Sequence, residues 1–176
     1  MTQQYLLSVD VGTQSTRAIL FDFEGNIVQK AQITHAPYEA PNAGWAEQDP
    51  EIYWQAICQA CQKLWQHHDP NQVLGLALTT QRATMLCVDA ENNPMRPAMV
   101  WLDQRQAKKL PKVANYWRAA FKLIGLDETI RYFQGQAECN WLAENEPDLW
   151  QKTDKYLFLS GFLIIRMVGE FVDSVG

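Results

Sequence analysis

The sequence lacks the features that would place the protein in a membrane, on a nucleic acid or outside the cell. It has no basic leader followed by a long apolar stretch, and its longest apolar run, residues 156–165, is too short to span a bilayer. It has no run rich in Lys and Arg, and its net charge of −5 argues against a polyanion partner. Only four cysteines occur in 176 residues, and their number and spacing do not indicate the disulfide framework of a small secreted protein. We therefore expect a cytoplasmic globular protein without nucleic-acid or membrane partners.

The cysteines leave one metal hypothesis open. Cys58 and Cys61 have a Cys-x-x-Cys spacing, and His67 and His68 follow soon after. These four side chains could hold a zinc ion. However, both cysteines lie in a helical pattern with no second ligand pair nearby, which favours two small apolar residues on a helix face.

A polar turn between two apolar runs is the most informative stretch. Residues 5–22 read as a strand, a tight hairpin and a second strand. The polar residues of this stretch are Asp10, Gly12, Thr13, Gln14, Ser15 and Arg17. Backbone amides and hydroxyls in such a loop can hold phosphate oxygens, and a carboxylate can hold a hydrated Mg²⁺. The stretch is neither a Walker A loop nor a Gly-x-Gly-x-x-Gly turn, and an ordinary hairpin remains the simpler alternative.

The rest of the chain reads as a single α/β unit without repeats or linkers. We expect a third strand at 27–34, a helix at about 50–67 and a strand at 73–80. The strand at 73–80 is almost continuously apolar, which predicts burial on both faces. A further strand follows from residue 85, and residues 106–153 are mostly helical. Polar residues gather at strand ends, where an open α/β sheet forms its ligand crevice.

Three motifs carry a resemblance to a known family. The hairpin has the form Asp-x-Gly-Thr-x-Ser-x-Arg, residues 44–50 read Gly-Trp-Ala-Glu-Gln-Asp-Pro, and residues 98–105 contain Trp-x-Asp-x-Arg. Together they resemble the FGGY carbohydrate kinases of the sugar kinase, Hsp70 and actin superfamily. The resemblance implies an α/β, ribonuclease H-like (actin-like ATPase) domain, with N-terminal antiparallel strands in a mixed sheet flanked by helices. It covers residues 1–176 as the opening portion of the family's first domain, incomplete at the C-terminus.

The resemblance also implies an activity, which is the transfer of phosphate from ATP to a sugar or polyol with Mg²⁺. On the ATP-phosphate and Mg²⁺ side it implicates Asp10, Gly12, Thr13, Gln14, Ser15 and Arg17, with Asp10 acting on the metal through water. On the acceptor side it implicates Gln81, Arg82, Trp101, Asp103 and Tyr132. The family's catalytic Asp lies beyond Gly176, so we expect the chain alone to be inactive. A homodimer is a family-level expectation.

One position departs from the glycerol kinase pattern. Residues 80–84 read Thr-Gln-Arg-Ala-Thr, whereas that subfamily has Asn-Gln-Arg-Glu-Thr. Ala83 therefore replaces a carboxylate that would bind two hydroxyls, which should strongly weaken a short polyol. We expect a longer polyol or a ketose as acceptor. The alternative is a non-catalytic or regulatory module of the same ATP-binding superfamily.

Overall fold

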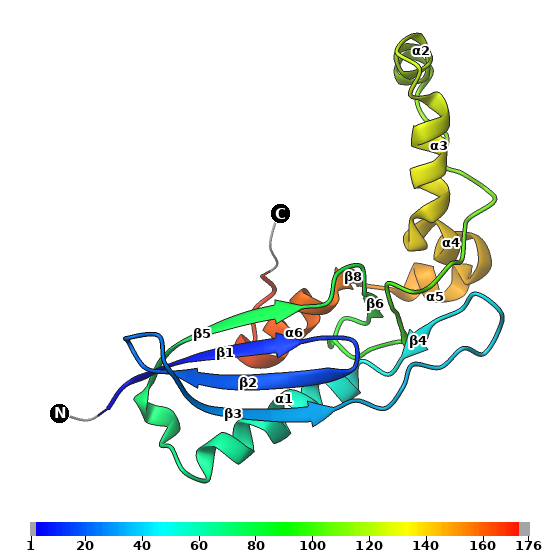
Figure 1. The fold of residues 1–176 in the computed structure, drawn as a ribbon. Helices are drawn as coiled ribbons and strands as arrows, with labels where there is room; N and C mark the ends of the chain where they lie inside the picture. Colours follow the sequence, from blue (N-terminus) through cyan, green and yellow to red (C-terminus); the bar gives the residue numbers. More distant parts are fainter. Residues whose placement is uncertain (1–2, 173–176) are drawn as a thin grey trace.

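A four-stranded mixed sheet forms the base of the protein (Figure 1). The computed structural model describes residues 3–172. The strands run in the order β3 (Ile27–Thr34), β2 (Ser15–Phe21), β1 (Tyr5–Val11) and β5 (Val73–Thr80). The first three are antiparallel, and β5 runs parallel to β1. The antiparallel N-terminal strands and the hairpin predicted from the sequence are thus confirmed.

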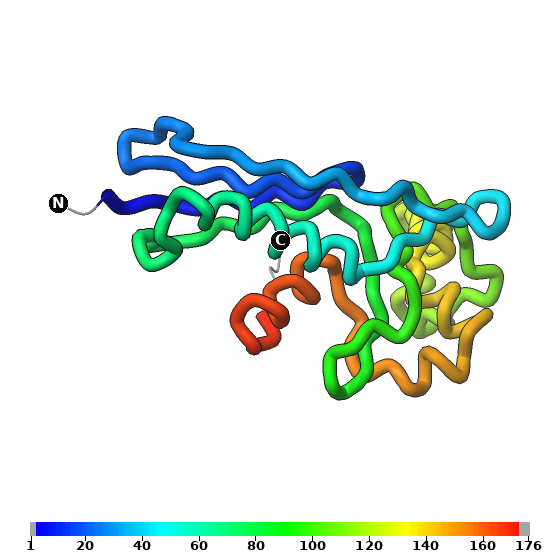
Figure 2. The backbone as a smooth tube through the Cα atoms, turned by 90° about the horizontal axis from the view of Figure 1, so that it is seen from below, coloured from blue at the N-terminus to red at the C-terminus, as the bar shows by residue number. Residues whose placement is uncertain are grey.

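Two helices cover one face of this sheet (Figures 1 and 2). They are α1 (Glu51–Trp65) and α6 (Leu159–Val168). In α1 the buried residues Tyr53, Ile57, Ala60 and Leu64 recur at helical spacing and form the stripe that faces the strands. They share one apolar core with alternate residues of β1 and β2 and with α6, which includes the fully buried Phe162. The sheet is therefore held from one side.

The opposite face of the sheet is open in the described structure. Leu74 and Leu76 of β5 are 58% and 49% exposed, so the expectation that residues 73–80 are buried on both faces is wrong. The reason is geometric, because alternate residues of a strand point to opposite faces and both helices lie on the same one. In addition, β5 has no partner strand on its outer side among residues 3–172.

A second, smaller sheet lies beyond the ends of β1 and β5. It contains β4 (Glu47–Gln48), β7 (Ala98–Met99), β6 (Met85–Val88) and β8 (Lys155–Phe158), in that order and all antiparallel. Cys87 and Met99 of this sheet form a small core with Leu142. The second sheet is built from segments far apart in the sequence. Before β5 of the large sheet, the chain forms a short 3₁₀ helix, η1 (Pro70–Gln72).

Four helices lie between β7 and β8 in the described chain. They are α2 (Asn115–Leu123), α3 (Asp127–Gln136), α4 (Glu138–Asn145) and α5 (Pro147–Lys152). Whereas α4 and α5 pack beside the second sheet, α2 and α3 project away from it (Figure 1). We refer to residues 108–136, which contain α2 and α3, as the arm. In the part of the chain that the structure describes, no helix has both the length and the apolar character needed to cross a membrane.

Candidate functional site

The β1–β2 hairpin places Asp10 and Arg17 side by side. The two residues are paired across the strands, and Arg17 Nη1 lies 2.8 Å from Asp10 Oδ2. Thr79, from the parallel neighbour β5, donates its hydroxyl to Asp10 Oδ1 at 3.0 Å. The side chain of Asp10 remains 43% exposed. The carboxylate is therefore fixed from two strands and still open to a ligand.

The turn of the hairpin is supported from several directions. Its closing hydrogen bond runs from Gly12 N to Ser15 O at 3.0 Å. The Ser15 hydroxyl accepts from Gln32 Nε2 of β3 at 3.1 Å, and the Gln14 carbonyl accepts from the backbone N–H of His35. The Thr13 hydroxyl accepts from Trp101 Nε1 at 3.0 Å. The turn is thus held by β3 on one side and by residue 101 on the other.

A hollow of about 780 Å³ opens beside this turn. That volume is in the range of small-molecule sites. It brings together hairpin residues, the segment after β3 and Trp101, which is 53% exposed. The residues implicated in phosphate binding that line it are Gly12, Thr13, Gln14, Ser15 and Arg17. The hollow can therefore present amides, hydroxyls and one guanidinium to an anion.

His35 is a residue of this site that the sequence analysis does not single out. It lines the hollow and is buried, with its Nε2 atom 2.8 Å from Thr16 Oγ1. Its ring also stands edge-on to Tyr53 of α1. Burial lowers the pKa of His35, so the ring is neutral at neutral pH. The sequence could have indicated His35 by its position alone, because it is the first residue after a strand that ends at the polar edge of the sheet.

Gln81, the first residue after β5, is held by hydrogen bonds to β1 and α1. Its backbone N–H donates to Val11 O at 2.8 Å, and its Nε2 atom donates to the hydroxyl of Tyr53 at 2.7 Å. That hydroxyl in turn donates to Gln48, and burial raises the pKa of Tyr53 to about 12. Next to this anchored glutamine, Arg82 is exposed and Ala83 adopts a left-handed backbone with φ of 49°. The anchor therefore fixes the start of a segment whose next side chains reach solvent.

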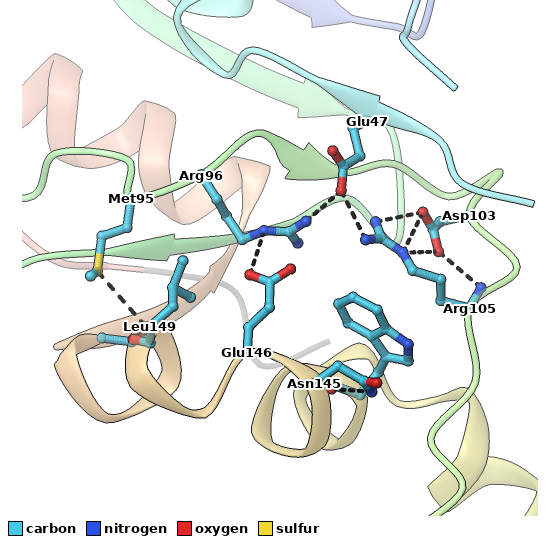
Figure 3. A network of polar contacts seen from close by, with 10 residues as sticks. Glu47, Met95, Arg96, Asp103, Arg105, Asn145, Glu146 and Leu149 are labelled. Carbon is cyan, nitrogen blue, oxygen red and sulfur yellow. Dashed lines mark hydrogen bonds and ion pairs between the residues drawn. The ribbon is translucent and has the colours of Figure 1, made fainter. Parts of the chain in front are cut away.

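Asp103 lies in a buried ion-pair network rather than in the hollow (Figure 3). Its carboxylate accepts from Arg105 Nη2 at 2.7 Å and from the backbone N–H of Ala46 at 2.8 Å. Arg105 also lies 2.8 Å from Glu47, and Arg96 links Glu47 to Glu146. This network ties the segment that contains Trp101 to β4 and to the junction of α4 and α5.

The arginine at the centre of this network is also enclosed by aromatic rings. The guanidinium of Arg105 lies over Trp45 and Trp141, 4.1 and 4.5 Å from the ring centroids. Cation–π contacts of this kind are stronger where water is excluded. The Trp-x-Asp-x-Arg motif thus sends Trp101 towards the hairpin and its two charged residues into the interior.

Tyr132 is the one implicated acceptor residue on the arm. It lies on α3, is exposed and packs edge-on against Phe133. It is not among the residues that line the hollow at the hairpin. The structure thus brings the hairpin residues and Trp101 together, anchors Gln81 close to them and leaves Tyr132 apart.

The metal hypothesis for the cysteines gains no geometric support. Burial raises the pKa of the thiols of Cys58 and Cys61, the latter to about 11, which disfavours the thiolate that binds metals. Among the described residues, no group of three or more His, Cys, Asp or Glu side chains is placed to hold a metal ion. Both cysteines lie within α1, and Cys61 packs against the main core.

Comparison with known proteins identifies the family. Residues 5–176 match the FGGY family of carbohydrate kinases, N-terminal domain. A glycerol kinase of Thermococcus gammatolerans is 34% identical over 177 residues, which cover 97% of this chain and 35% of that protein. A gluconokinase of Bacillus licheniformis is 26% identical, with 96% of this chain and 33% of that protein covered.

Solved structures agree with this result. The crystal structure of a gluconate kinase from Lactobacillus acidophilus superimposes with a TM-score of 0.76 at 19% identity, covering 97% of this chain and 34% of that one. The likeness confirms the predicted α/β fold of the actin-like ATPases. The chain spans about a third of the length of these relatives. From its motifs, its hairpin geometry and these matches, the chain belongs to the FGGY family of carbohydrate kinases.

Proposed function

We propose that the protein to which this chain belongs phosphorylates a hydroxyl of a sugar or polyol at the expense of ATP. The observation that carries the proposal is the arrangement at the hairpin. An exposed carboxylate, Asp10, lies between a guanidinium and a hydroxyl, next to a tight turn that presents donors to a hollow. Phosphoryl transfer depends mainly on such positioning and charge stabilisation.

The hairpin is the proposed nucleotide side. Gly12, Thr13, Gln14 and Ser15 would contact phosphate oxygens, and Arg17 would offset the charge of the transferring group. The residues present fit a magnesium ion held through water, because the Asp10 carboxylate is exposed and is the acid at this turn. When bound, such an ion neutralises phosphate charge. Asp10 holds its place by accepting from Thr79.

The segment from Gln81 to Trp101 provides the proposed acceptor side. The exposed side chain of Arg82 and the indole of Trp101 are available to a polyol. Gln81 adds a buried side-chain oxygen that has no hydrogen-bond partner in the described structure. Asp103 and Tyr132 are retained as proposed acceptor residues, Asp103 through its hold on the loop that carries Trp101. Because Ala83 offers no carboxylate, a longer polyol or a ketose is the proposed substrate rather than glycerol.

We further propose that the 176 residues alone do not catalyse turnover. A base must take the proton of the acceptor hydroxyl. Asp10 is paired with Arg17, and Asp103 is enclosed by Arg105. Neither carboxylate is therefore free to act as that base.

An assay of ADP release by the whole protein tests the function. With a panel of glycerol, gluconate and xylulose, we expect turnover that depends on one acceptor. Asp10→Asn should lower kcat by about 100-fold, because it removes the carboxylate proposed to hold, through water, the magnesium ion that offsets the phosphate charge. Arg82→Ala should instead raise KM for the acceptor by about tenfold or more, with the KM for ATP changed little.

Lys30→Ala is the matched control, since it removes an exposed cation of β3 that is not among the residues lining the hollow. It should leave the KM for the acceptor and the KM for ATP unchanged. ADP release that is the same with and without every acceptor would refute the kinase proposal. Equal loss of acceptor and ATP affinity in Arg82→Ala would refute the assignment of Arg82. Turnover by the 176-residue chain alone would refute its proposed inactivity.

A further inference from the structure

A second hollow, of about 510 Å³, lies on the arm. It is formed by the segment that precedes α2 and by α2 and α3 themselves. None of its lining residues is among those assigned to the proposed kinase site, although Tyr132 lies on the same helix, α3. The lining of this hollow is therefore distinct from the residues that the proposed function uses.

The charge of this hollow is opposite to that of the chain. Its lining includes four cations, Lys108, Lys112, Arg118 and Arg131, and one carboxylate, Asp127. The chain as a whole carries a net charge of −5. Within residues 3–172 none of the four cations forms an ion pair. The four cations around one cavity repel each other, and an anion bound in the cavity would offset that repulsion.

The wall of the hollow is held in place before any ligand binds. Gln134 of α3 donates its side-chain amide to Pro111 O at 3.1 Å. The backbone N–H of Ala107 donates to Gly135 O at 2.9 Å, and those of Lys108 and Lys109 donate to Glu144 of α4. The segment before α2 is thus fastened to two helices. A preformed site loses less entropy when it binds a ligand.

The size and the remaining lining indicate a small organic ligand. The volume is in the range of small-molecule sites and offers no extended surface to a macromolecule. Apolar side chains of Leu110, Phe121 and Ile130 lie among the cations. Guanidinium groups match the geometry of phosphate oxygens and can bind them in a bidentate way. Several cations around one cavity suit a group that carries two or more negative charges.

We infer that the arm carries a binding site for a small phosphorylated metabolite, separate from the proposed ATP and acceptor sites. Arg118 of α2 and Arg131 of α3 hold the phosphate oxygens from two helices, with Lys108 and Lys112 adding charge from the preceding segment. Leu110, Phe121 and Ile130 contact the organic part. This inference does not rest on the proposed kinase activity.

Inorganic pyrophosphate is the probe, and nuclear magnetic resonance of the ¹⁵N-labelled full chain is the measurement. We expect shifts of backbone amides within residues 108–134 that saturate with pyrophosphate. The same shifts should persist in Arg17→Gln, which separates this site from the hairpin. The double variant Arg118→Gln/Arg131→Gln should weaken binding at the arm by about tenfold or more, because two charge-assisted contacts are lost. Binding should also weaken as salt is added.

A matched double variant controls for charge. Lys109→Gln/Lys122→Gln removes two cations from the same arm, and neither residue lines the hollow. It should leave the dissociation constant within about twofold. Equal weakening in both double variants would show a diffuse field and overturn the site. Absence of shifts in the arm would overturn it too, and tighter binding of citrate than of pyrophosphate would overturn the assignment to phosphate.

Discussion

The sheet region and the arm bury their apolar residues to very different extents. In the sheet and its two helices, Val9, Leu20 and Phe162 have no exposed surface. In the arm, no residue of α2 is buried, and Leu123 is 88% exposed. The sheet region is therefore held by a shared core, whereas the arm keeps its shape through local helix hydrogen bonds and a few fastening contacts. Stability and surface chemistry are divided between the two regions.

The buried ion-pair network lies between these regions. Arg105 connects Asp103 with Glu47 of β4 and stacks on Trp141 of α4. It is the point at which the second sheet is tied to the helices that carry the arm. Three pairs of variants compare these parts of the molecule, and their expected effects decrease from the ion-pair network to the main core and then to His35.

Arg105→Ala should have the largest effect. It leaves the carboxylate of Asp103 buried without its cation, and removal of one partner of a buried pair costs about 3–5 kcal/mol. Urea unfolding should show this loss, or no cooperative transition at all. The control Arg118→Ala, on the arm and without an ion pair in the described structure, should change stability by less than about 0.5 kcal/mol. Similar losses in the two variants would contradict the network's role.

The same substitution in each region gives the next comparison. Leu20→Ala should lower the free energy of unfolding by about 2–5 kcal/mol, because it opens a cavity in the main core. Leu123→Ala should change it by less than about 0.5 kcal/mol, because that side chain already faces solvent. Urea unfolding of both variants is the measurement. A loss in Leu123→Ala as large as that in Leu20→Ala would show that the arm has a core of its own.

The smallest expected effect is on the pH dependence of stability, and it comes from His35 beside the hairpin. Burial lowers the pKa of His35 below its ordinary value of 6.5. As the pH falls through 6.5, the unfolded chain therefore binds a proton that the folded chain does not, and stability decreases until the lowered pKa is reached. The slope cannot exceed about 1.4 kcal/mol per pH unit for one proton.

Urea unfolding between about pH 7 and pH 5 measures this slope. His35→Gln should flatten it, since glutamine can still contact Thr16 but does not titrate. His67→Gln is the matched control, because His67 is exposed, and it should leave the slope unchanged. A slope in His35→Gln equal to that of the parent chain would refute the assignment.

Periodicity predicted the elements of the large sheet well. The strands at 27–34 and 73–80 have the expected bounds, and the expected helix at 50–67 is observed as Glu51–Trp65. The helix repeats its apolar residues at helical spacing and the strand at 73–80 is a long apolar run bounded by polar residues, so both patterns are strong. Burial of 73–80 was predicted wrongly, because apolar composition does not reveal which faces of a sheet are covered.

The strand from residue 85 was predicted, but the pairing of the second sheet and the burial of its acids could not be derived from the sequence. β4 and β7 have two residues each, too few to show a period, and they pair only because distant segments meet. Asp103 looks like an exposed strand-end acid in the sequence, yet Arg105 and Ala46 N enclose it. His35 gave no motif at all. In each case a tertiary contact decides the role of the residue, and local pattern is silent about such contacts.

The Asp10–Arg17 pair makes the hairpin neutral before any ligand arrives. An isolated phosphate that binds Arg17 would leave the Asp10 carboxylate beside another negative charge. An isolated cation that takes Asp10 would leave the guanidinium beside another positive charge. Only a ligand that brings both signs together can replace the pair without leaving like charges opposed. Within the proposed function, we therefore expect the hairpin to discriminate by charge balance and to favour a polyphosphate already complexed with a metal ion.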